Sequence, residues 1–447
     1  MRARTKGFHI GLACIALAGL AYRVWYVLQE RGRIRLNGDA AYYHWQANDL
    51  AHGLWFIDPG QYHWYGRITP SAGHPPVYLL YLAAVSKFIG QSELTHRLAS
   101  CVLGGAAIYV IGLVGREVWD ERVGLFAAAG ASVYALLWIN DEMLMSESAY
   151  VLTSALMVFW ALRFWKRPSV GNAALMGAGI ALAALTRAEA VMLFPLLALP
   201  FAFARKHENW GVRIRYLVAA GGVGAALMAP WIGFNLTRFQ KPVLMSNGIG
   251  SVLMVANCDD TYSGALFGYW SINCAKGLAN LKGDESQKEV VWRKRGIDYI
   301  KAHGDKYPAV TAARIARMWG VWTPSRISQG VEYDAKLEGR GVWQTQLGTD
   351  QYFVLLPLAL VGVVIMRRRR KVPILPFVAI AGTITFTAAT TFGITRYRVP
   401  VDAMLPVLAG VAFFTAVDWF KASQRRAAPV NVPITTELRA PVGVAGS

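Results

Sequence analysis

Long runs of apolar residues, separated by short polar connections, make up most of the chain. A helix needs about 17 to 25 apolar residues to cross the hydrocarbon core of a bilayer. The segments that meet or approach this length are residues 9–28, 98–118, 123–139, 148–165, 172–187, 189–204, 215–234, 350–366, 373–391 and 400–420. The pattern predicts an all-α polytopic membrane protein with about ten transmembrane helices.

The overall composition agrees with this assignment. Of the 447 residues, 55% are hydrophobic and 16% are charged, and the mean hydropathy is +0.32, unlike an ordinary soluble domain. The formal net charge of +19 would suit a nucleic-acid partner, but Lys and Arg occur in short patches between the apolar runs. Membrane topology explains these patches, so we expect membrane lipids and no nucleic acid as partners.

The positions of Lys and Arg set the expected orientation. With a cytoplasmic N-terminus, alternate connections carry the basic clusters at residues 116–122, 163–167, 205–215 and 367–371, as the positive-inside rule requires. The first apolar run is too long for a signal-peptide core and lacks a convincing cleavage site, so it is interpreted as a transmembrane helix. We therefore predict a multi-pass protein of the cell membrane with both termini in the cytoplasm.

Two long segments then lie outside the cytoplasm. Residues 29–95 include an apolar stretch, 71–90, that is expected to form an amphipathic helix at the membrane surface. Residues 235–349, with Asp284 as a helix N-cap, predict a small helical extracytoplasmic domain. The expected organisation is an N-terminal transmembrane catalytic module over 1–234, the helical segment 235–349, transmembrane helices over 350–420 and a flexible cytoplasmic tail over 421–447.

The four cysteines agree with this assignment of sides. Cys14 and Cys101 fall within expected spans, whereas Cys258 and Cys274 fall in the second outside segment, where the compartment permits oxidation. We predict a disulfide between Cys258 and Cys274. Two unpaired thiols are the alternative, since sequence alone does not prove pairing.

Charged residues also gather at the outside ends of the expected spans. They are Asp39, Asp141, Glu142, Glu147, Arg187, Glu189, Arg396 and Arg398. Charges near hydrocarbon are costly unless they are paired, solvated or used. Each residue alone is consistent with a solvated turn or a structural ion pair, but their gathering on one side indicates a site.

Glycosyl transfer from a lipid-linked sugar phosphate needs both classes of residue. A carboxylate takes a proton from the attacking hydroxyl, and arginines bind the phosphate of the leaving group. We assign the donor phosphate to Arg187, Arg396 and Arg398. The last two flank Tyr397, and an extended backbone before Pro400 would point both to the same side.

The order of several motifs resembles the C superfamily of glycosyltransferases (GT-C), in the branch of protein O-mannosyltransferase-like and aminoarabinose transferase-like enzymes. The motifs are "GDAAYYHWQANDLAHG", "GHPPVYLLYLAAVSKFIG", "THRLASCVLGG", "NDEMLMSE", "TRAEAVMLFPL", "APWIGFN" and "RYRVP". The resemblance implies a fold of many membrane helices with an outward cavity under amphipathic surface helices. It also implies a polyprenyl-phosphate sugar donor, used on the extracytoplasmic side.

By this resemblance Asp39 is the catalytic carboxylate, acting as general base. The residues expected to bind substrate are Asp141, Glu142, Glu147 and Glu189, with Tyr43 and His74 from the first two motifs. No metal ion or other cofactor is predicted, although Asp39, Asp141 and Glu142 carry oxygen atoms that suit one. The motifs leave the sugar open, and the acceptor is a glycan, a lipid or a protein of the cell envelope.

Other interpretations remain at this stage. Asp39 would be only a helix N-cap if the aromatic stretch after it is an interfacial belt. The whole chain would be a transporter or flippase of a lipid-linked sugar, which predicts internal repeats, and none is clear. A non-catalytic scaffold is the third reading. The cysteine-closed segment has no counterpart among the branches that the chain resembles.

Overall fold

The computed structural model describes residues 2–30, 36–277, 281–322, 335, 336, 338–369 and 372–427. In this part of the chain helices form the whole architecture, and no strand longer than the isolated bridge between Ile57 and Pro70 occurs. The predicted all-α membrane fold is confirmed. Six helices are long and apolar enough to cross a membrane: α1 (Arg2–Gln29), α5 (Glu93–Val118), α8 (Glu147–Lys166), α11 (Trp210–Leu236), α16 (Val342–Arg369) and α19 (Leu405–Ala427).

A seventh crossing is made if a bent pair counts as one span. Helices α6 (Glu121–Val133) and α7 (Ala135–Glu142) meet at Tyr134 with a bend of 50°. The polar end of this pair, residues 141 and 142, is predicted to lie in a short connection at the outside end of a span. It is instead helical and buried, because α7 continues through Asp141 and Glu142 into the protein interior.

Three of the ten predicted spans form shorter apolar helices. They are α9 (Val170–Ala184), α17 (Leu375–Thr390) and the stretch Ala188–Phe203. That stretch is divided into η1 (Ala188–Met192), η2 (Phe194–Ala198) and α10 (Leu199–Phe203). Pro195 and Pro200 lie at the starts of the last two pieces, and proline interrupts a helix because it lacks a backbone N–H.

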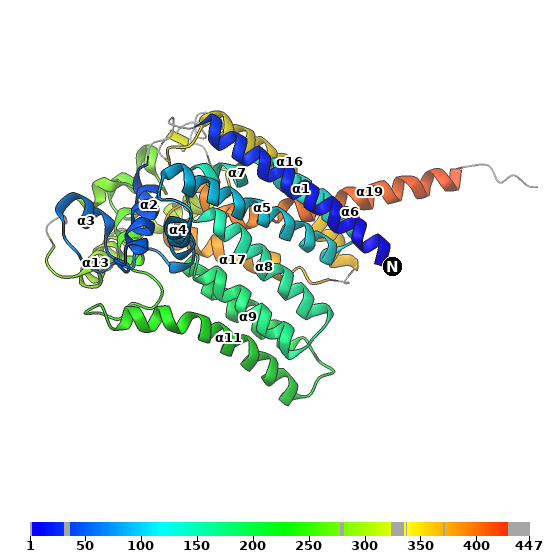
Figure 1. Ribbon diagram of the computed structural model, residues 1–447, viewed down its shortest axis with the longest axis horizontal. Helices are drawn as coiled ribbons and strands as arrows, with labels where there is room; N and C mark the ends of the chain where they lie inside the picture. The colour runs from blue at the N-terminus through cyan, green and yellow to red at the C-terminus, as the bar shows by residue number, and fades with distance from the viewer. Residues whose placement is uncertain are drawn as a thin grey trace, which may run out of the picture.

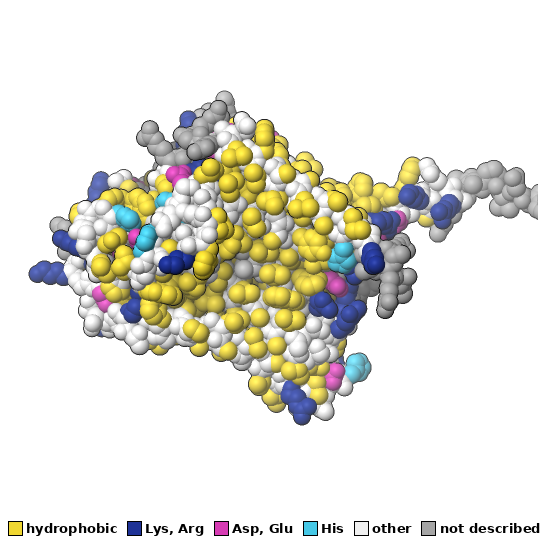
Figure 2. All heavy atoms as spheres, viewed as in Figure 1, with side chains coloured by type: hydrophobic (Ala, Val, Ile, Leu, Met, Phe, Trp, Pro, Cys, Tyr) yellow, Lys and Arg dark blue, Asp and Glu magenta, His cyan; other side chains and the backbone are white. Residues whose placement is uncertain are grey.

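The long helices lie alongside one another and pack through small residues (Figure 1). Helix α5 is central and packs against α1, α6 and α8, while α9 lies between α8 and α11. Gly177 lets α9 approach α11 closely, since a Cβ there would lie 2.0 Å from the backbone oxygen of Ala220 in α11. Hydrophobic side chains cover the middle of the visible face, and Lys and Arg gather toward its two ends (Figure 2).

The first outside segment folds into three helices at one end of the bundle (Figure 1). They are α2 (Gly38–Ala51), α3 (Pro59–Tyr65) and α4 (Pro76–Phe88). Helix α4 confirms the predicted helix, and it buries Tyr78, Leu79 and Leu82 against α2 and α5. Its place at the membrane surface stays a prediction.

The second outside segment is helical as predicted. It contains α12 (Ile249–Val255), η3 (Asp259–Thr261), η4 (Gly264–Leu266), η5 (Ile272–Ala275), α13 (Glu285–Ala302) and α14 (Tyr307–Met318). The Asp284 carboxylate accepts a hydrogen bond from the Gln287 backbone N–H, and the Gln287 side chain accepts one from the Asp284 N–H. This capping box confirms the predicted N-cap.

The start of α1 and the end of α19 both lie toward the opposite end of the bundle (Figure 1). The N-terminus of α1 and the end of α19 are both remote from α2, α3 and α13 (Figure 1). Helix α19 continues to Ala427, beyond the predicted boundary at residue 420. The rest of the predicted tail, residues 428–447, lies outside the described residues.

A pair of glycine substitutions tests the packing of α9 on α11. Gly177→Ala places a methyl group against the Ala220 carbonyl, so we expect a loss of about 1–3 kcal/mol of stability from overpacking. Gly222→Ala is the control, because nothing lies within 4 Å of a Cβ at that position of α11. Thermal unfolding in detergent should show a lower transition temperature for Gly177→Ala alone, and equal temperatures would contradict this packing.

Candidate active site

Asp39 lies at the start of α2, close to an arginine from the other end of the sequence. It is the second residue of the helix, and Asn37 is the N-cap, so the alternative that made Asp39 a simple cap is wrong. The Asp39 Oδ2 atom accepts a hydrogen bond of 3.2 Å from Arg396 Nη2. The Asp39 side chain is 40% exposed and that of Arg396 is 15% exposed. The carboxylate is thus paired and still reachable from outside.

Arg396 is held by a short helical turn rather than by an extended segment. Residues Thr395–Arg398 form the 3-10 helix η6, followed by α18 (Val399–Asp402). The expected extended backbone before Pro400 is therefore wrong. Arg396 and Arg398 consequently have different partners: Arg396 meets Asp39, whereas Arg398 Nε donates a 2.8 Å hydrogen bond to Asp402 Oδ1.

Glu147 joins two arginines inside the protein. It is the first residue of α8 and its side chain is 1% exposed. Its Oε1 atom accepts a 2.8 Å hydrogen bond from Arg187 Nη1 and lies 3.2 Å from Arg396 Nε. The preceding connection contains Leu144 with φ of +56°, a left-handed conformation that costs a non-glycine residue about 1–2 kcal/mol. This unfavourable backbone conformation lies in the turn that leads into Glu147.

Arg187 extends the network to a third carboxylate. It lies just after α9, and its Nε atom donates a 2.7 Å hydrogen bond to Glu189 Oε1. Its guanidinium also lies over the rings of Tyr150 and Tyr397, at 5.9 and 5.2 Å from their centroids. A continuous chain of charges therefore runs Asp39, Arg396, Glu147, Arg187, Glu189.

His74 and Tyr43 flank the same carboxylate. The Tyr43 hydroxyl lies 3.0 Å from His74 Nδ1, and His74 Nε2 lies 3.8 Å from Asp39 Oδ1. Tyr43 follows Asp39 by one helical turn of α2, and His74 comes from the loop before α4. The structure thus brings seven of the predicted residues together: Asp39, Tyr43, His74, Glu147, Arg187, Glu189 and Arg396.

The neighbouring charges keep Asp39 ionised. Desolvation raises the pKa of Asp39, but the positive charge of Arg396, helped by His74 and Arg187, outweighs it and lowers the pKa below its usual value. The pKa of His74 is also lowered, chiefly by desolvation and further by Arg187 and Arg396. At neutral pH the site therefore holds a carboxylate beside an uncharged imidazole.

Three of the predicted residues lie in other buried pairs or pockets. Asp141 accepts a 2.9 Å hydrogen bond from Arg23 Nε of α1 and a 2.6 Å bond from Ser148 Oγ. The Glu142 side chain is fully buried and lies beside Tyr26 of α1. Arg398 lies under Tyr352, with its guanidinium 3.4 Å from the ring centroid. These three residues therefore belong to the buried interior and not to the surroundings of the exposed Asp39 carboxylate.

Sequence reasoning missed several neighbours of the site. Tyr150 and Tyr397 contact Arg187, and Met145 lies with its sulfur 3.8 Å from Arg396 Nη1. Tyr397 and Met145 lie within two of the motifs and Tyr150 lies three residues after one, but none carries a charge, so nothing marked them. Arg23 was detectable, since an arginine within an apolar span needs a buried partner.

The described residues contain no group of three or more His, Cys, Asp or Glu side chains placed to hold a metal ion. Asp39 lies beside Arg396 and His74, whose second nitrogen faces the Tyr43 hydroxyl, and the charge of Arg187 also acts on it. Guanidinium groups suit anions such as phosphate. The arrangement can therefore accept a proton at Asp39 and bind an anionic group beside it.

Comparison with known proteins supports the resemblance found in the sequence. Residues 73–234, less than half of the chain, match the family described as dolichyl-phosphate-mannose-protein mannosyltransferase. The oligosaccharyltransferase of Archaeoglobus fulgidus in complex with Zn and sulfate superposes with a TM-score of 0.54 at 14% identity, over 94% of this chain and 50% of that protein. The chain has the GT-C fold.

One further structure supports this fold, and another is less similar to this chain. The apo form of the same archaeal enzyme has a TM-score of 0.51 at 14% identity, over 93% of this chain and 52% of that one. ArnT from Cupriavidus metallidurans, bound to undecaprenyl phosphate, has a TM-score of 0.44 at 12% identity, over 94% and 81% of the two chains, a similarity too low to support an argument. This GT-C chain spans about half the length of the archaeal enzyme, and no curated protein matches its sequence.

The shared carboxylate of Glu147 gives a test of the network. Glu147→Gln removes the negative charge between Arg187 and Arg396, and breaking a buried ion pair costs about 3 kcal/mol. Glu189→Gln is the control, because Glu189 is 21% exposed and bonds to Arg187 alone among these arginines, so its loss should cost less than about 1 kcal/mol. Thermal unfolding of the two variants should show the larger shift for Glu147→Gln, and the reverse order would refute the central place of Glu147.

Proposed function

We propose that this GT-C protein transfers a sugar from a polyprenyl-phosphate-linked donor to an acceptor of the cell envelope, with Asp39 as general base. The observation that carries the proposal is the ionised, accessible Asp39 carboxylate beside Arg396, in a network with a second arginine. The matched family, whose description includes dolichyl-phosphate-mannose, supports this donor class.

The reaction joins an acceptor hydroxyl to the anomeric carbon of the sugar while the bond to the phosphate breaks. Asp39 takes the hydroxyl proton, and the phosphate leaves with the electron pair. Before donor binding, the pairing with Arg396 makes Asp39 ionised but weakly basic. When the donor phosphate engages Arg396, that pairing weakens and the pKa of Asp39 rises, so the base becomes stronger once the donor is bound.

The donor phosphate is assigned to Arg396 and Arg187. Arg187 uses Nε and Nη1 for Glu189 and Glu147, and among the described residues none accepts a hydrogen bond from its Nη2 atom. Among the described residues, Arg396 Nη1 has only the Met145 sulfur, a weak acceptor. Each arginine thus has an N–H group to offer to a phosphate oxygen. Arg398, which is 2% exposed and paired with Asp402, is reassigned to a structural role.

The site is proposed to face the extracytoplasmic side. The Cys258–Cys274 disulfide lies in the segment that packs beside η6, and disulfides persist in oxidising compartments. The basic clusters of residues 163–167 and 367–369 lie at the far ends of α8 and α16, in agreement with the positive-inside rule. A donor with its sugar phosphate at the outer surface would meet Asp39 there.

Replacement of Asp39 tests the general base. Asp39→Asn keeps the size of the side chain but removes the base, so turnover with a polyprenyl-phosphate sugar should fall about 10²- to 10⁴-fold while donor binding persists. Asp58→Asn is the matched control from the same segment, because Asp58 caps α3 by accepting a hydrogen bond from the Gln61 N–H, a role that Asn also fills. Normal turnover in Asp39→Asn would remove Asp39 from catalysis.

A comparison of two arginines tests the phosphate assignment. Arg396→Lys keeps the charge but loses the planar fork that suits phosphate oxygens, so the KM for the donor should rise roughly tenfold. Arg398→Lys should lower thermal stability and leave the KM of the folded enzyme unchanged. A raised KM in Arg398→Lys together with a normal one in Arg396→Lys would reverse the assignment.

A further inference from the structure

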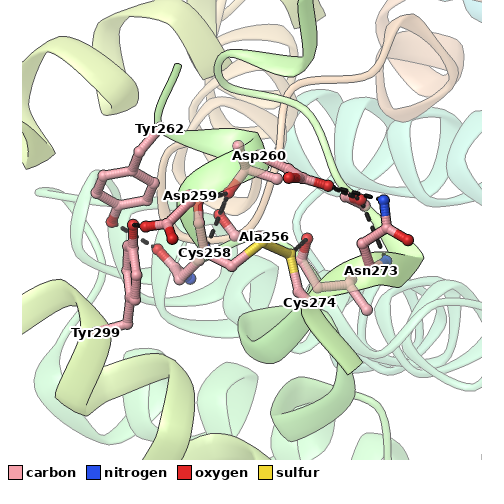
Figure 3. Close-up of a disulfide and its surroundings, with 12 residues drawn as sticks. Ala256, Cys258, Asp259, Asp260, Tyr262, Asn273, Cys274 and Tyr299 are labelled. Atoms are coloured by element: carbon pink, nitrogen blue, oxygen red, sulfur yellow. Dashed lines mark hydrogen bonds between the residues drawn. A yellow bond between two sulfur atoms is a disulfide. The ribbon is translucent and has the colours of Figure 1, made fainter. Parts of the chain in front are cut away.

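The loop closed by the disulfide is tied at both ends. Cys258 follows α12 and bonds to Cys274 in η5, across a separation of 16 residues. Asp260 joins the same two ends, since its Oδ2 atom accepts hydrogen bonds from Ser271 Oγ and Asn273 Nδ2 (Figure 3). The Ser271 N–H also donates to the Val255 carbonyl at the end of α12. The closed loop is therefore a compact unit.

The middle of this loop lies against the chain that leads into η6. The Gly393 N–H donates a 2.9 Å hydrogen bond to the Gly268 carbonyl. The rings of Tyr269 and Trp270 both lie 6.5 Å from the ring of Phe392. A Cβ at Gly393 would lie 2.2 Å from the backbone oxygen of Arg314, so only glycine permits this approach. Arg396 follows three residues later in the chain.

Arg314 of α14 joins the base of the loop to the same segment. Its side chain is fully buried, and its Nη2 atom donates to the Ala256 carbonyl at 2.6 Å and to Asn257 Oδ1 at 3.0 Å. Its Nη1 atom lies 3.5 Å from the Ala389 carbonyl near the end of α17. The residues before Cys258 and those before η6 thus share one arginine.

One apolar cluster covers these contacts and reaches the site. Its buried members are Ala256, Tyr269, Met318, Ile384, Ala388, Phe392, Ile394 and Tyr397. Tyr397 is the neighbour of Arg396 and lies under the Arg187 guanidinium. Movement of the loop would therefore displace the turn that presents Arg396 to Asp39 and Glu147.

We propose that the disulfide-closed loop, residues 258–274, is a positioning element that holds Arg396 against Asp39 and Glu147, so that opening the disulfide weakens sugar transfer without unfolding the protein. The inference rests on the proposed function for its effect on activity, but not for its effect on structure. A dithiol opens the bond by giving two electrons and two protons to the two sulfurs, and is itself oxidised to a disulfide. The compartment's redox state would thereby set the activity.

Hydrogen exchange tests the structural part without any substrate. In the double variant Cys258→Ser/Cys274→Ser, the amides of residues 389–398 should exchange at least roughly tenfold faster than in the parent, because the Gly393 N–H loses a fixed acceptor. Cys14→Ser, in the exposed part of α1, is the control and should exchange as the parent does. Unchanged exchange at Gly393 in the double variant would overturn the proposal, whatever the protein catalyses.

Steady-state kinetics test the consequence for the site. With a polyprenyl-phosphate sugar, kcat/KM of the double variant should fall roughly 10- to 100-fold, as expected for a misplaced binding group. The acid limb of its pH profile should move to higher pH, since Asp39 loses a positive charge that lowers its pKa while His74 and Arg187 still face it. A merely structural role would reduce the amount of folded enzyme and leave the limb in place.

Gly393→Ala gives the same test with the disulfide intact. Its methyl group cannot fit against Arg314, so the same shift of the acid limb is expected. An unmoved limb and an unchanged donor KM in both variants would refute the positioning role. If the parent itself transfers no sugar, the proposed function fails, and the exchange measurement still decides whether the loop positions Arg396.

Discussion

The buried carboxylate of Glu147 is the interaction on which the candidate site depends. An ionised carboxylate that is 1% exposed needs a positive charge beside it to offset the cost of burial. Arg187 and Arg396 both supply such a charge to Glu147. Arg187 follows α9, Arg396 lies in η6, and Glu147 begins α8. One buried charge therefore fixes the relative positions of three segments that are far apart in the sequence.

This sharing also explains how the exposed carboxylate is held. Arg396 is oriented by Glu147 from the inside and meets Asp39 on its other side. Asp39 is thereby kept ionised without being fully buried, which is the condition that its proposed role as general base requires. Arg23 and Asp141 form a second buried pair, and Asp141 also accepts a hydrogen bond from Ser148, the residue after Glu147. This pair helps to hold the start of α8 in place.

The disulfide-closed loop adds a second constraint on the same turn. Its contacts with Gly393 and Phe392 act on the chain just before Arg396, whereas Glu147 acts on the arginine itself. In the proposed reaction Arg396 loosens its pairing with Asp39 when the donor binds. The backbone that carries Arg396 must then be fixed, because an arginine side chain alone has many rotamers. The disulfide-closed loop and Glu147 thus both act on the position of the Arg396 guanidinium.

The sequence by itself determined the membrane class, the helical fold, the disulfide and most members of the site, because each depends on local or compositional signals. Apolar run length, the Asp284 cap and the two cysteines in one outside segment needed no knowledge of distant contacts. Sequence could not separate Arg396 from Arg398, since their division arises from the helical turn η6 and from which carboxylate each side chain reaches, Asp39 and Glu147 or Asp402. The sequence also predicts a short connection for Asp141 and Glu142, whereas the structure has both at the end of helix α7 and buried. Only the tertiary structure decided these points, because the free energy of a charge depends on its partners and on its distance from water, and neither is written in the residues beside it.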